Sequence, residues 1–207
     1  MSKDSESNKI SRRNFLGKAG TGIVGSTILI SSIGAADKTG PDLAEAPPID
    51  PKETDILNLW VNGKKQKLKI NPSSTLAEVL RNKLNLTGTK IVCNQGACGG
   101  CTVVMDNKAV YACHMLALDA AGKKVVTIEG LLEGEELNHL QEAFIEKDGL
   151  QCGFCTPGQI MSAYALLLSK PNPNREDIME AMSGNICRCG AYPNILDSVL
   201  LAVQNKN

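Results

Sequence analysis

The chain has 207 residues, and its 22 Lys and Arg residues balance its 22 Asp and Glu residues. This balance, without a basic stripe or an acidic tail, argues against a nucleic-acid-binding surface and against an acidic disordered tail. The length allows one large or two small domains. Because only 3% of the residues are aromatic, a bound inorganic core would help two small domains to stay folded.

The N-terminus has the pattern of an export signal. A polar segment with Arg12-Arg13 precedes an apolar stretch that is too short and too rich in Gly and Ser for a good membrane span. The string "SRRNFL" resembles the twin-arginine signal pattern, with Gly17 where a lysine is usual. We therefore expect a twin-arginine signal peptide over residues 1–36, cleaved after Ala36, and a periplasmic protein. The alternatives are a chance arginine pair and retention as a membrane anchor.

A polar, Pro-rich linker is expected over residues 37–53, and a β pattern follows it directly. Apolar and polar residues alternate from Leu57 to Val61, and Asn62-Gly63 then predicts a two-residue hairpin turn before a return strand. A first antiparallel hairpin is therefore expected to open the fold.

One helix and further strands complete this first domain. The segment "TLAEVLRNKLNL" has apolar residues at helical spacing, and Thr75 with Glu78 forms a capping box. Short strands are expected in "CTVVM", "AVYAC" and "KKVVTIEGL". This order predicts a small α+β domain over residues 54–132, in which a sheet packs on one helix.

Four helical segments follow, and they predict an all-α bundle over residues 133–207. The first is expected to end at Gly149. The second has Thr156 as its N-cap and Leu168 on its apolar face, and the third has Asn174 as its cap. The segments are "LNHLQEAFIEKDG", "TPGQIMSAYALLLSK", "NREDIMEAMSG" and "AYPNILDSVLLAVQN".

Eight cysteines divide evenly between the two predicted domains. In the first domain the spacing is C-x4-C-x2-C-x11-C, which matches the plant-type ferredoxin template for a [2Fe–2S] cluster. Gly96, Gly99 and Gly100 in this loop allow unusual φ angles and let backbone N–H groups point at sulfur. The predicted ligands of the first cluster are Cys93, Cys98, Cys101 and Cys113.

The second domain holds the pairs "CGFC" and "CRC" in the spacing C-x2-C-x31-C-x1-C. Cys155 directly precedes an expected helix, whose partial positive charge at the N-terminus favours an anionic cluster. In a locally extended "CRC" the side chains of Cys187 and Cys189 would point the same way and reach one iron. The predicted ligands of the second cluster are Cys152, Cys155, Cys187 and Cys189.

Three other uses of the cysteines remain open at this point. Export favours a disulfide framework, although 8 cysteines in 207 residues are fewer than disulfide scaffolds carry. Structural zinc sites usually repeat C-x2-C over a shorter gap than the second set has. A thioredoxin-type pair at Cys152 and Cys155 lacks the expected βαβ surroundings.

The strings "CNQGACGGC", "QCGFCTPG" and "GNICRCGAY" resemble the iron–sulfur subunit of the xanthine oxidase family of molybdenum hydroxylases. The most similar kind is the exported aldehyde or isoquinoline oxidoreductase type, and the resemblance covers nearly all of residues 54–205. It implies an α+β chain with an N-terminal β-grasp 2Fe-2S ferredoxin-like domain. An all-α, four-helix domain with a second [2Fe–2S] cluster would follow.

The resemblance also implies roles and partners. The molybdopterin cofactor would lie on a large partner subunit, close to Gln151 and Cys189 and nearer to the second cluster. Electrons would pass from it through both clusters to a flavin (FAD) subunit or a c-type cytochrome. No residue of this chain is a credible catalytic acid or base, so oxidation of an aldehyde or N-heterocycle would occur on the partner. A free-standing two-cluster electron carrier is the alternative.

The remaining conspicuous residues have structural interpretations. His114 and His139 are interpreted as surface or supporting residues, because eight thiolates already complete two clusters. Met161, Met179 and Met182 are expected to fill the core.

Overall fold

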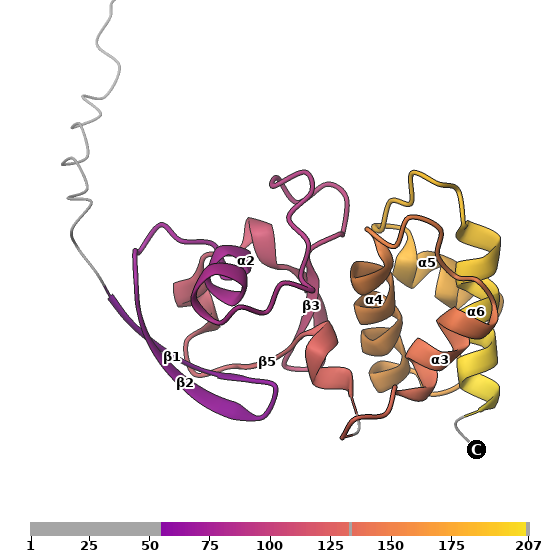
Figure 1. Cartoon of the computed structure of the whole chain (residues 1–207), viewed down its shortest axis with the longest axis horizontal. Helices are drawn as coiled ribbons and strands as arrows, with labels where there is room; N and C mark the ends of the chain where they lie inside the picture. Colours follow the sequence, from indigo (N-terminus) through magenta and orange to yellow (C-terminus); the bar gives the residue numbers. More distant parts are fainter. Residues whose placement is uncertain (1–54, 133, 206–207) are drawn as a thin grey trace, which may run out of the picture. The chain divides into compact units, whose positions relative to one another are not determined.

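The computed structural model describes residues 55–132 and 134–205, which form a sheet lobe and then a helical lobe (Figure 1). The predicted signal peptide 1–36, its cleavage after Ala36 and the linker 37–53 lie outside the described residues. The described residues belong to one compact unit, so the two lobes share it. No helix in the described part of the chain is long and apolar enough to cross a membrane.

A five-stranded mixed sheet, with strand order β2-β1-β5-β3-β4, forms the sheet lobe. The first strand pairs in parallel with the last, and every other pairing is antiparallel. This arrangement of two hairpins around a parallel pair is the predicted β-grasp fold. The strands are β1 (Asp55–Val61), β2 (Lys64–Ile70), β3 (Thr102–Met105), β4 (Lys108–Tyr111) and β5 (Lys124–Val126).

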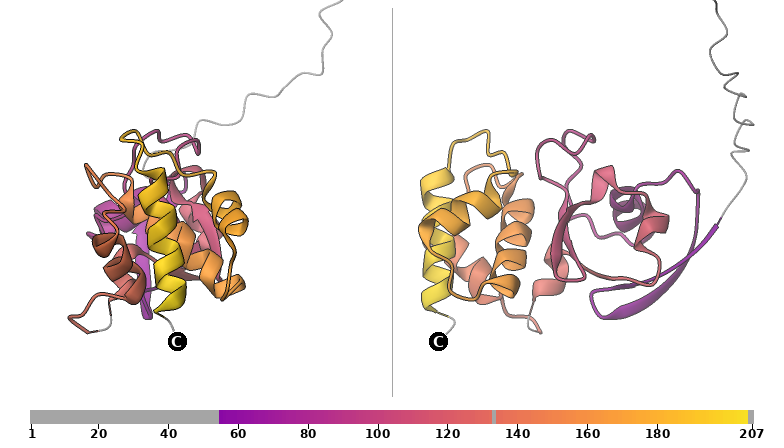
Figure 2. Two further views of the ribbon diagram at one scale, coloured as in Figure 1. Left: turned by 90° about the vertical axis from the view of Figure 1, so that its right-hand side faces the viewer. Right: turned by 180° about the vertical axis from the view of Figure 1, so that it is seen from behind.

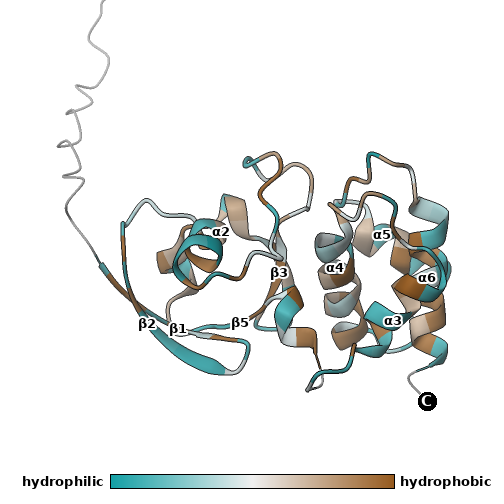
Figure 3. Cartoon of the chain, viewed as in Figure 1, coloured by the Kyte–Doolittle hydropathy of each residue, from teal (hydrophilic) through white to brown (hydrophobic). Residues whose placement is uncertain are grey.

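The first hairpin forms as the sequence predicts. Asn62 and Gly63 have φ angles of 49° and 75°, which suits a two-residue turn that needs two positive φ values. Leu57, Leu59 and Val61 of β1 are buried on one face of the sheet, and the residues between them are exposed. β2 is largely hydrophilic (Figure 3), and lysines on an edge strand discourage pairing with another chain.

One short helical segment packs on the buried face of the sheet. The predicted capping box of Thr75 and Glu78 is present at the start of α2 (Leu76–Glu78). The segment continues as the π-helix η1 (Val79–Lys83) rather than as a regular α-helix, with Leu84 N–H donating to the Val79 carbonyl. Short 3₁₀ turns complete the lobe: η2 (Ala112–His114), η3 (Ala117–Ala120) and η4 (Ile128–Leu131).

All four segments that were predicted to be helical are helices in the helical lobe, as Figure 2 shows. Asn138 and Asn174 each form a capping box, which satisfies backbone N–H groups of the first turn. The helices are α3 (His139–Glu146), α4 (Thr156–Ser169), α5 (Arg175–Met182) and α6 (Tyr192–Gln204).

Several predicted details of the helices differ from the structure. Cys155, rather than Thr156, is the N-cap of α4. α3 ends before Gly149, because Asp148 takes the positive φ angle of 49°. Leu168, which was expected on the buried face of α4, is 43% exposed. α4 packs against β3 as well as against the other helices. Its buried surface is therefore not the single apolar face that the sequence pattern implied, and Leu168 lies outside that surface.

The methionine interpretation is right for two of three residues. Met161 and Met182 are buried in the helical core, whereas Met179 is half exposed. Val104 of β3 also packs into that core. The sheet lobe therefore contributes directly to the hydrophobic core of the helical lobe.

Candidate iron–sulfur centres

The first set of four cysteines gathers at one end of the sheet lobe. Cys93, Cys98 and Cys101 lie in the loop that leads into β3, and Cys113 lies in η2 directly after β4. The antiparallel pairing of β3 with β4 places Thr102 opposite Tyr111. This pairing brings the fourth cysteine back beside the loop that holds the other three, as the spacing predicts.

Backbone N–H groups of this loop point at the cysteine sulfurs. Gly96 N–H lies 3.4 Å from Cys113 Sγ, and Ala97 N–H lies 3.4 Å from Cys93 Sγ. Cys113 N–H also donates to Cys101 Sγ at 3.4 Å. Donors of this kind stabilise the negative charge of thiolates, so the loop suits an anionic cluster.

The glycines of the loop serve two different purposes. Gly96 and Gly99 have φ angles of 72° and 69°, as predicted. Gly100 does not have a positive φ angle, and a Cβ atom there would lie 2.7 Å from Cγ2 of Val92. The prediction of an unusual φ angle is therefore wrong for Gly100. A glycine is required there because a Cβ atom would collide with the Val92 side chain.

Two thiols of this set have pKa values that are shifted in opposite directions. Backbone N–H groups of Gln95 and Ala97 lower the pKa of Cys93 to about 6, whereas burial raises the pKa of Cys101 to about 12. Side-chain hydrogen bonds join Cys93 to Cys98 and Cys101 to Cys113. A set with two such pairs offers two thiol groups to each of two irons.

The second set lies on two loops of the helical lobe. Cys152 and Cys155 precede α4, and Cys187 and Cys189 lie between α5 and α6. Side-chain hydrogen bonds join Cys152 to Cys189 and Cys155 to Cys187. Each pair therefore takes one thiol from each loop.

The expected extended conformation of "CRC" is wrong. Cys189 lies in a turn in which Gly190 N–H donates to the Cys187 carbonyl at 3.3 Å. The turn separates the two side chains, so each pairs with a cysteine of the other loop rather than with its neighbour. The two loops are nevertheless brought together, which the spacing alone could not establish.

One end of the second set is buried and the other faces the surface. Burial raises the pKa of Cys155 to about 11, while the backbone N–H of Phe154 and the Cys189 side chain lower the pKa of Cys152. Cys152 and Cys189 are exposed, and so is Gln151 beside them. A partner could therefore approach the second set from the Cys152–Cys189 side.

The buried side of the second set offers an unused hydrogen-bond donor. The hydroxyl of Thr156, next to Cys155, is buried and has no hydrogen-bond partner within the described residues. A buried hydroxyl normally has a partner, and a cluster sulfur close to Cys155 would supply an acceptor. The residues present therefore fit a bound iron–sulfur group at this position.

Each cysteine set has the number of thiols that a [2Fe–2S] core needs. No group of three or more His, Cys, Asp or Glu residues in the described ranges is placed to hold one metal ion. A [2Fe–2S] core needs four thiolates in all, with two for each iron. All eight cysteines lie within these ranges as free thiols, and none forms a disulfide.

The two sets meet where the lobes touch. Ile186, directly before Cys187, donates its N–H to the Cys98 carbonyl at 3.0 Å. Gly158 in the first turn of α4 packs so closely that a Cβ atom there would collide with the Gly99 carbonyl. The loop with three cysteines of the first set is thus in direct backbone contact with a loop that holds two of the second.

Neither histidine belongs to a cysteine set. His114 is exposed, and its ring covers Gly96, where a Cβ atom would lie 3.0 Å from its Cγ. His139 begins α3, and its Nε2 atom is buried without a partner among the described residues.

Two residues beside the second set were not singled out from the sequence, namely Tyr192 and Asn185. The hydroxyl of Tyr192 accepts the Cys187 N–H at 2.8 Å. The string "GNICRCGAY" contains both, but nothing in it indicates their contacts.

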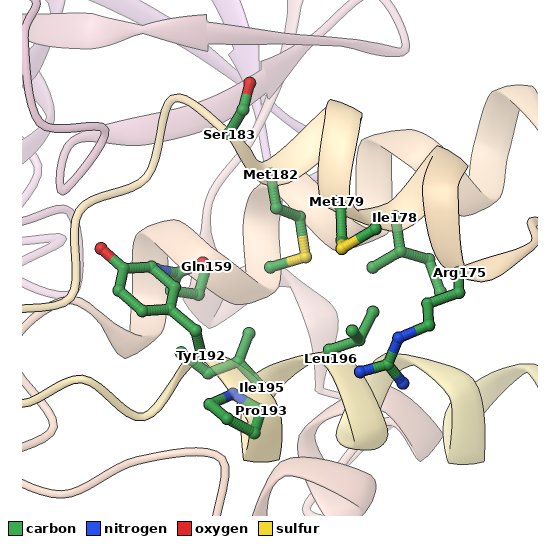
Figure 4. A pocket seen from close by; sticks show the side chains of 10 residues that line it. All are labelled: Gln159, Arg175, Ile178, Met179, Met182, Ser183, Tyr192, Pro193, Ile195 and Leu196. Carbon is green, nitrogen blue, oxygen red and sulfur yellow. The ribbon is translucent and has the colours of Figure 1, made fainter.

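An apolar pocket of about 380 Å³ lies between α5 and α6 in the helical lobe (Figure 4). Met179, Met182 and Leu196 line it, with Arg175 at one end and Tyr192 at the other. The pocket contains no cysteine and no pair of acid and base groups, so it offers no catalytic arrangement of its own.

Fold and sites define a protein with two [2Fe–2S]-binding domains, and comparison with known proteins agrees. A model of the 2Fe-2S iron-sulfur cluster binding domain matches residues 59–126. A model of the [2Fe-2S] binding domain matches residues 127–200. Each match contains one complete set of four cysteines.

Proteins of known class resemble the chain over most of its length. The nicotine 6-hydroxylase small subunit of Paenarthrobacter nicotinovorans is 45% identical over 77% of this chain and 96% of its own. The aldehyde oxidoreductase iron-sulfur-binding subunit PaoA of Escherichia coli (strain K12) is 42% identical over 77% of this chain and 74% of its own. A chain in the crystal structure of quinoline 2-oxidoreductase from Pseudomonas putida 86 is 40% identical in sequence and matches with a TM-score of 0.71. The match covers 73% of this chain and 94% of that chain.

The chain therefore belongs to the iron–sulfur subunits of the xanthine oxidase family of molybdenum hydroxylases. It is an electron-transfer subunit of an oxidoreductase, and substrate chemistry is not assigned to any residue in it.

Proposed function

We propose that this chain relays electrons from a molybdopterin cofactor on a large partner subunit to an acceptor outside the chain. The eight cysteines would hold two [2Fe–2S] clusters, each of which supplies one-electron redox chemistry. Cys93, Cys98, Cys101 and Cys113 would hold the first, and Cys152, Cys155, Cys187 and Cys189 the second. The domains would span residues 54–132 and 133–207.

The observation that carries this proposal is the contact between the two sets. The Cys98 carbonyl accepts the N–H of Ile186, which precedes Cys187. A relay needs its two centres close together without water or a mobile side chain between them. The glycines on either side of this contact leave room for the loops to touch, and Gly99 and Gly100 are both buried.

A partner surface is proposed beside the second set. Cys152 and Cys189 are exposed, and the neighbouring side chains of Phe154, Ile186 and Tyr192 are between 49% and 53% exposed. Apolar side chains gathered at the surface are typical of a protein interface. We infer that the large subunit covers this surface and brings its pterin close to Gln151 and Cys189.

The substrate class is proposed from the relatives. Nicotine 6-hydroxylase and quinoline 2-oxidoreductase are named for N-heterocycles, and PaoA belongs to an aldehyde oxidoreductase. An aldehyde or an N-heterocycle is therefore the proposed substrate of the complex. A flavin subunit with FAD or a c-type cytochrome is the proposed acceptor. Export by the twin-arginine route to the periplasm is proposed from the N-terminal sequence.

Native purification of the chain from its own cells tests the proposal. We expect four irons per chain, two distinct paramagnetic signals after reduction, and a large molybdenum-containing subunit in the same complex. A single signal or far fewer than four irons would contradict the two-cluster assignment. A chain that carries both clusters but purifies alone would favour the free-standing electron carrier.

A further inference from the structure

Asn185 is a buried polar residue that connects the two lobes. It lies two residues before Cys187 and is 4% exposed. Its Nδ2 atom donates to the Gly99 carbonyl at 3.0 Å and approaches Thr102 Oγ1 at 3.4 Å. We call the loop with Cys93, Cys98 and Cys101 the first ligand loop, and the loop with Cys187 and Cys189 the second ligand loop. The Asn185 side chain of the second ligand loop therefore binds the backbone of the first.

The amide of Asn185 is held from the other side as well. Ser162 of α4 donates its hydroxyl to Asn185 Oδ1 at 2.7 Å, and Gln159 donates its Nε2 to the Asn185 backbone carbonyl at 3.2 Å. All three residues are buried. Because Ser162 occupies the oxygen of the amide, the nitrogen is the atom left to face Gly99, so the orientation of the amide is fixed.

The space around this amide leaves no slack. A Cβ atom on Gly99 would lie 2.6 Å from Asn185 Nδ2 and 2.7 Å from the Gly184 carbonyl. Gly99 directly follows Cys98 in the first ligand loop. Ile186, which is next to Asn185, donates its N–H to the Cys98 carbonyl. Any shift of the Asn185 amide must therefore move one ligand loop relative to the other.

We propose that Asn185 is a positioning residue that sets the separation and mutual orientation of the two clusters. This inference rests on the proposed function, because it requires both clusters. Electron transfer between two centres falls steeply as their separation grows, and so does the magnetic interaction between two reduced clusters. An amide that keeps the loops in contact therefore controls both quantities, although it touches neither iron.

Two substitutions at Asn185 test this role in the purified holoprotein. Asn185→Ala removes both amide contacts. Asn185→Asp keeps nearly the same shape and an acceptor for Ser162, but it places a carboxylate oxygen opposite the Gly99 carbonyl. We expect four irons and two paramagnetic signals in each variant, with the low-temperature splitting between the signals changed and transfer between the clusters slowed. Asn174→Ala is the control, because it removes an exposed helix cap of α5 that takes no part in the contact between the loops.

The measurements separate positioning from stability. If both Asn185 variants keep full iron and the splitting and transfer rate of the unsubstituted protein, the inference is overturned. It is also overturned if Asn174→Ala changes the splitting as much, because general loosening would then explain the effect. A single paramagnetic signal in the unsubstituted protein would instead contradict the proposed function.

A milder variant decides the case if the Asn185 variants lose iron. Ser162→Ala leaves the Asn185 amide in place but removes the hydroxyl that orients it. We expect this variant to keep both clusters and to show a smaller change of the same splitting. An unchanged splitting in fully loaded Ser162→Ala, together with iron loss in the Asn185 variants, would assign Asn185 to cluster assembly and overturn the positioning role.

Discussion

Thiols of raised and of lowered pKa occur together in both cysteine sets. Burial raises the pKa of Cys101 to about 12 and of Cys155 to about 11, whereas Cys93 has a pKa of about 6. A buried thiol with a raised pKa holds its proton at neutral pH, and a metal must displace that proton when it binds. Cluster loading therefore releases protons from Cys101 and Cys155, whereas the lowered pKa of Cys93 favours its thiolate form.

Loss of a single ligand should affect one cluster only. We expect Cys101→Ser to remove the first paramagnetic signal and Cys189→Ser to remove the second, because each thiol belongs to one set. Iron analysis and spectra of the reduced variants measure this. Bleaching of both centres to the same extent by either substitution would show that the ligands are shared differently.

The hydroxyl of Thr156 should influence the reduction potential of the second cluster. If it donates to a cluster sulfur, Thr156→Val removes one hydrogen bond, worth ~1 kcal/mol net. For a one-electron couple this corresponds to ~40 mV towards more negative potential. Redox titration followed by paramagnetic resonance measures the shift.

Thr89→Val is the control for this titration. The Thr89 hydroxyl is also buried without a partner among the described residues, but it lies in the sheet lobe. This substitution should leave the potential of the second cluster unchanged. Equal shifts from both substitutions would exclude a specific role for Thr156.

At the scale of residues, sequence spacing located the cysteines but not the atoms that arrange them. The plant-type spacing predicts four ligands in one loop and hairpin, because those contacts are local. Asn185 could not be identified in this way, since its partner Gly99 lies 86 positions away. The pairing of Cys187 with Cys155 was also missed, because "CRC" forms a local turn that ends at Gly190 instead of the extended segment that was expected.

At the scale of elements, α4 departs most from its predicted pattern. A surface helix has one apolar stripe, but α4 is covered by β3 on one side and by other helices elsewhere. Gly158, Gln159 and Ser162 are therefore buried although none is a typical core residue. The hairpin, the Thr75 capping box and the Asn174 cap were predicted from sequence, because neighbours in the chain form them. The capping box of Asn138 also consists of local contacts, although it was not predicted.

A salt bridge couples the end of α4 to the start of α5. Lys170 contacts Asp177, and this side-chain hydrogen bond, together with the Asn174 N–H, lowers the pKa of Asp177. A carboxyl group with a lowered folded-state pKa stabilises the fold above its unfolded pKa of ~3.9, and the contribution is lost as the pH falls through the folded pKa. We expect Asp177→Asn to be less stable than the unsubstituted protein at neutral pH.

The difference should shrink as the solution is acidified below the ordinary pKa of an aspartate. Thermal unfolding of both proteins across this range measures it. Glu176→Gln is the control, because Glu176 is exposed in the same turn and forms no ion pair among the described residues. A stability difference that stays constant down to the lowest pH would exclude the charge of Asp177 as its cause.

At the scale of the whole molecule, the sequence predicted two cores and the division of the cysteines between them. It did not predict how closely the lobes join. Val104 of the sheet lobe lies in the core of the helical lobe, and Gly158 meets the Gly99 carbonyl. The contact of Gly158 with Gly99 depends on the absence of a side chain, and a glycine in a sequence does not reveal which neighbour needs the space.

The twin-arginine interpretation makes a prediction for the whole protein in cells. Replacing Arg12 and Arg13 with lysines should keep the protein in the cytoplasm, because the arginine pair is the feature of the signal that the export route would recognise. Fractionation of cells that express both versions measures this, with iron content as a control for folding. Equal amounts of both versions in the periplasm would contradict the proposed route.

The parallel pairing of β1 with β5 has a consequence for synthesis on the ribosome. The first strand of the sheet pairs with β2 at once, but its parallel partner exists only after residues 124–126 have been made. By then all four cysteines of the first set have been made, whereas Cys187 and Cys189 of the second set follow later in the chain. A second cluster held by these cysteines would therefore be inserted only after the sheet lobe has been synthesised, so a secretion channel that threads unfolded chains during synthesis would be unsuitable for the loaded protein.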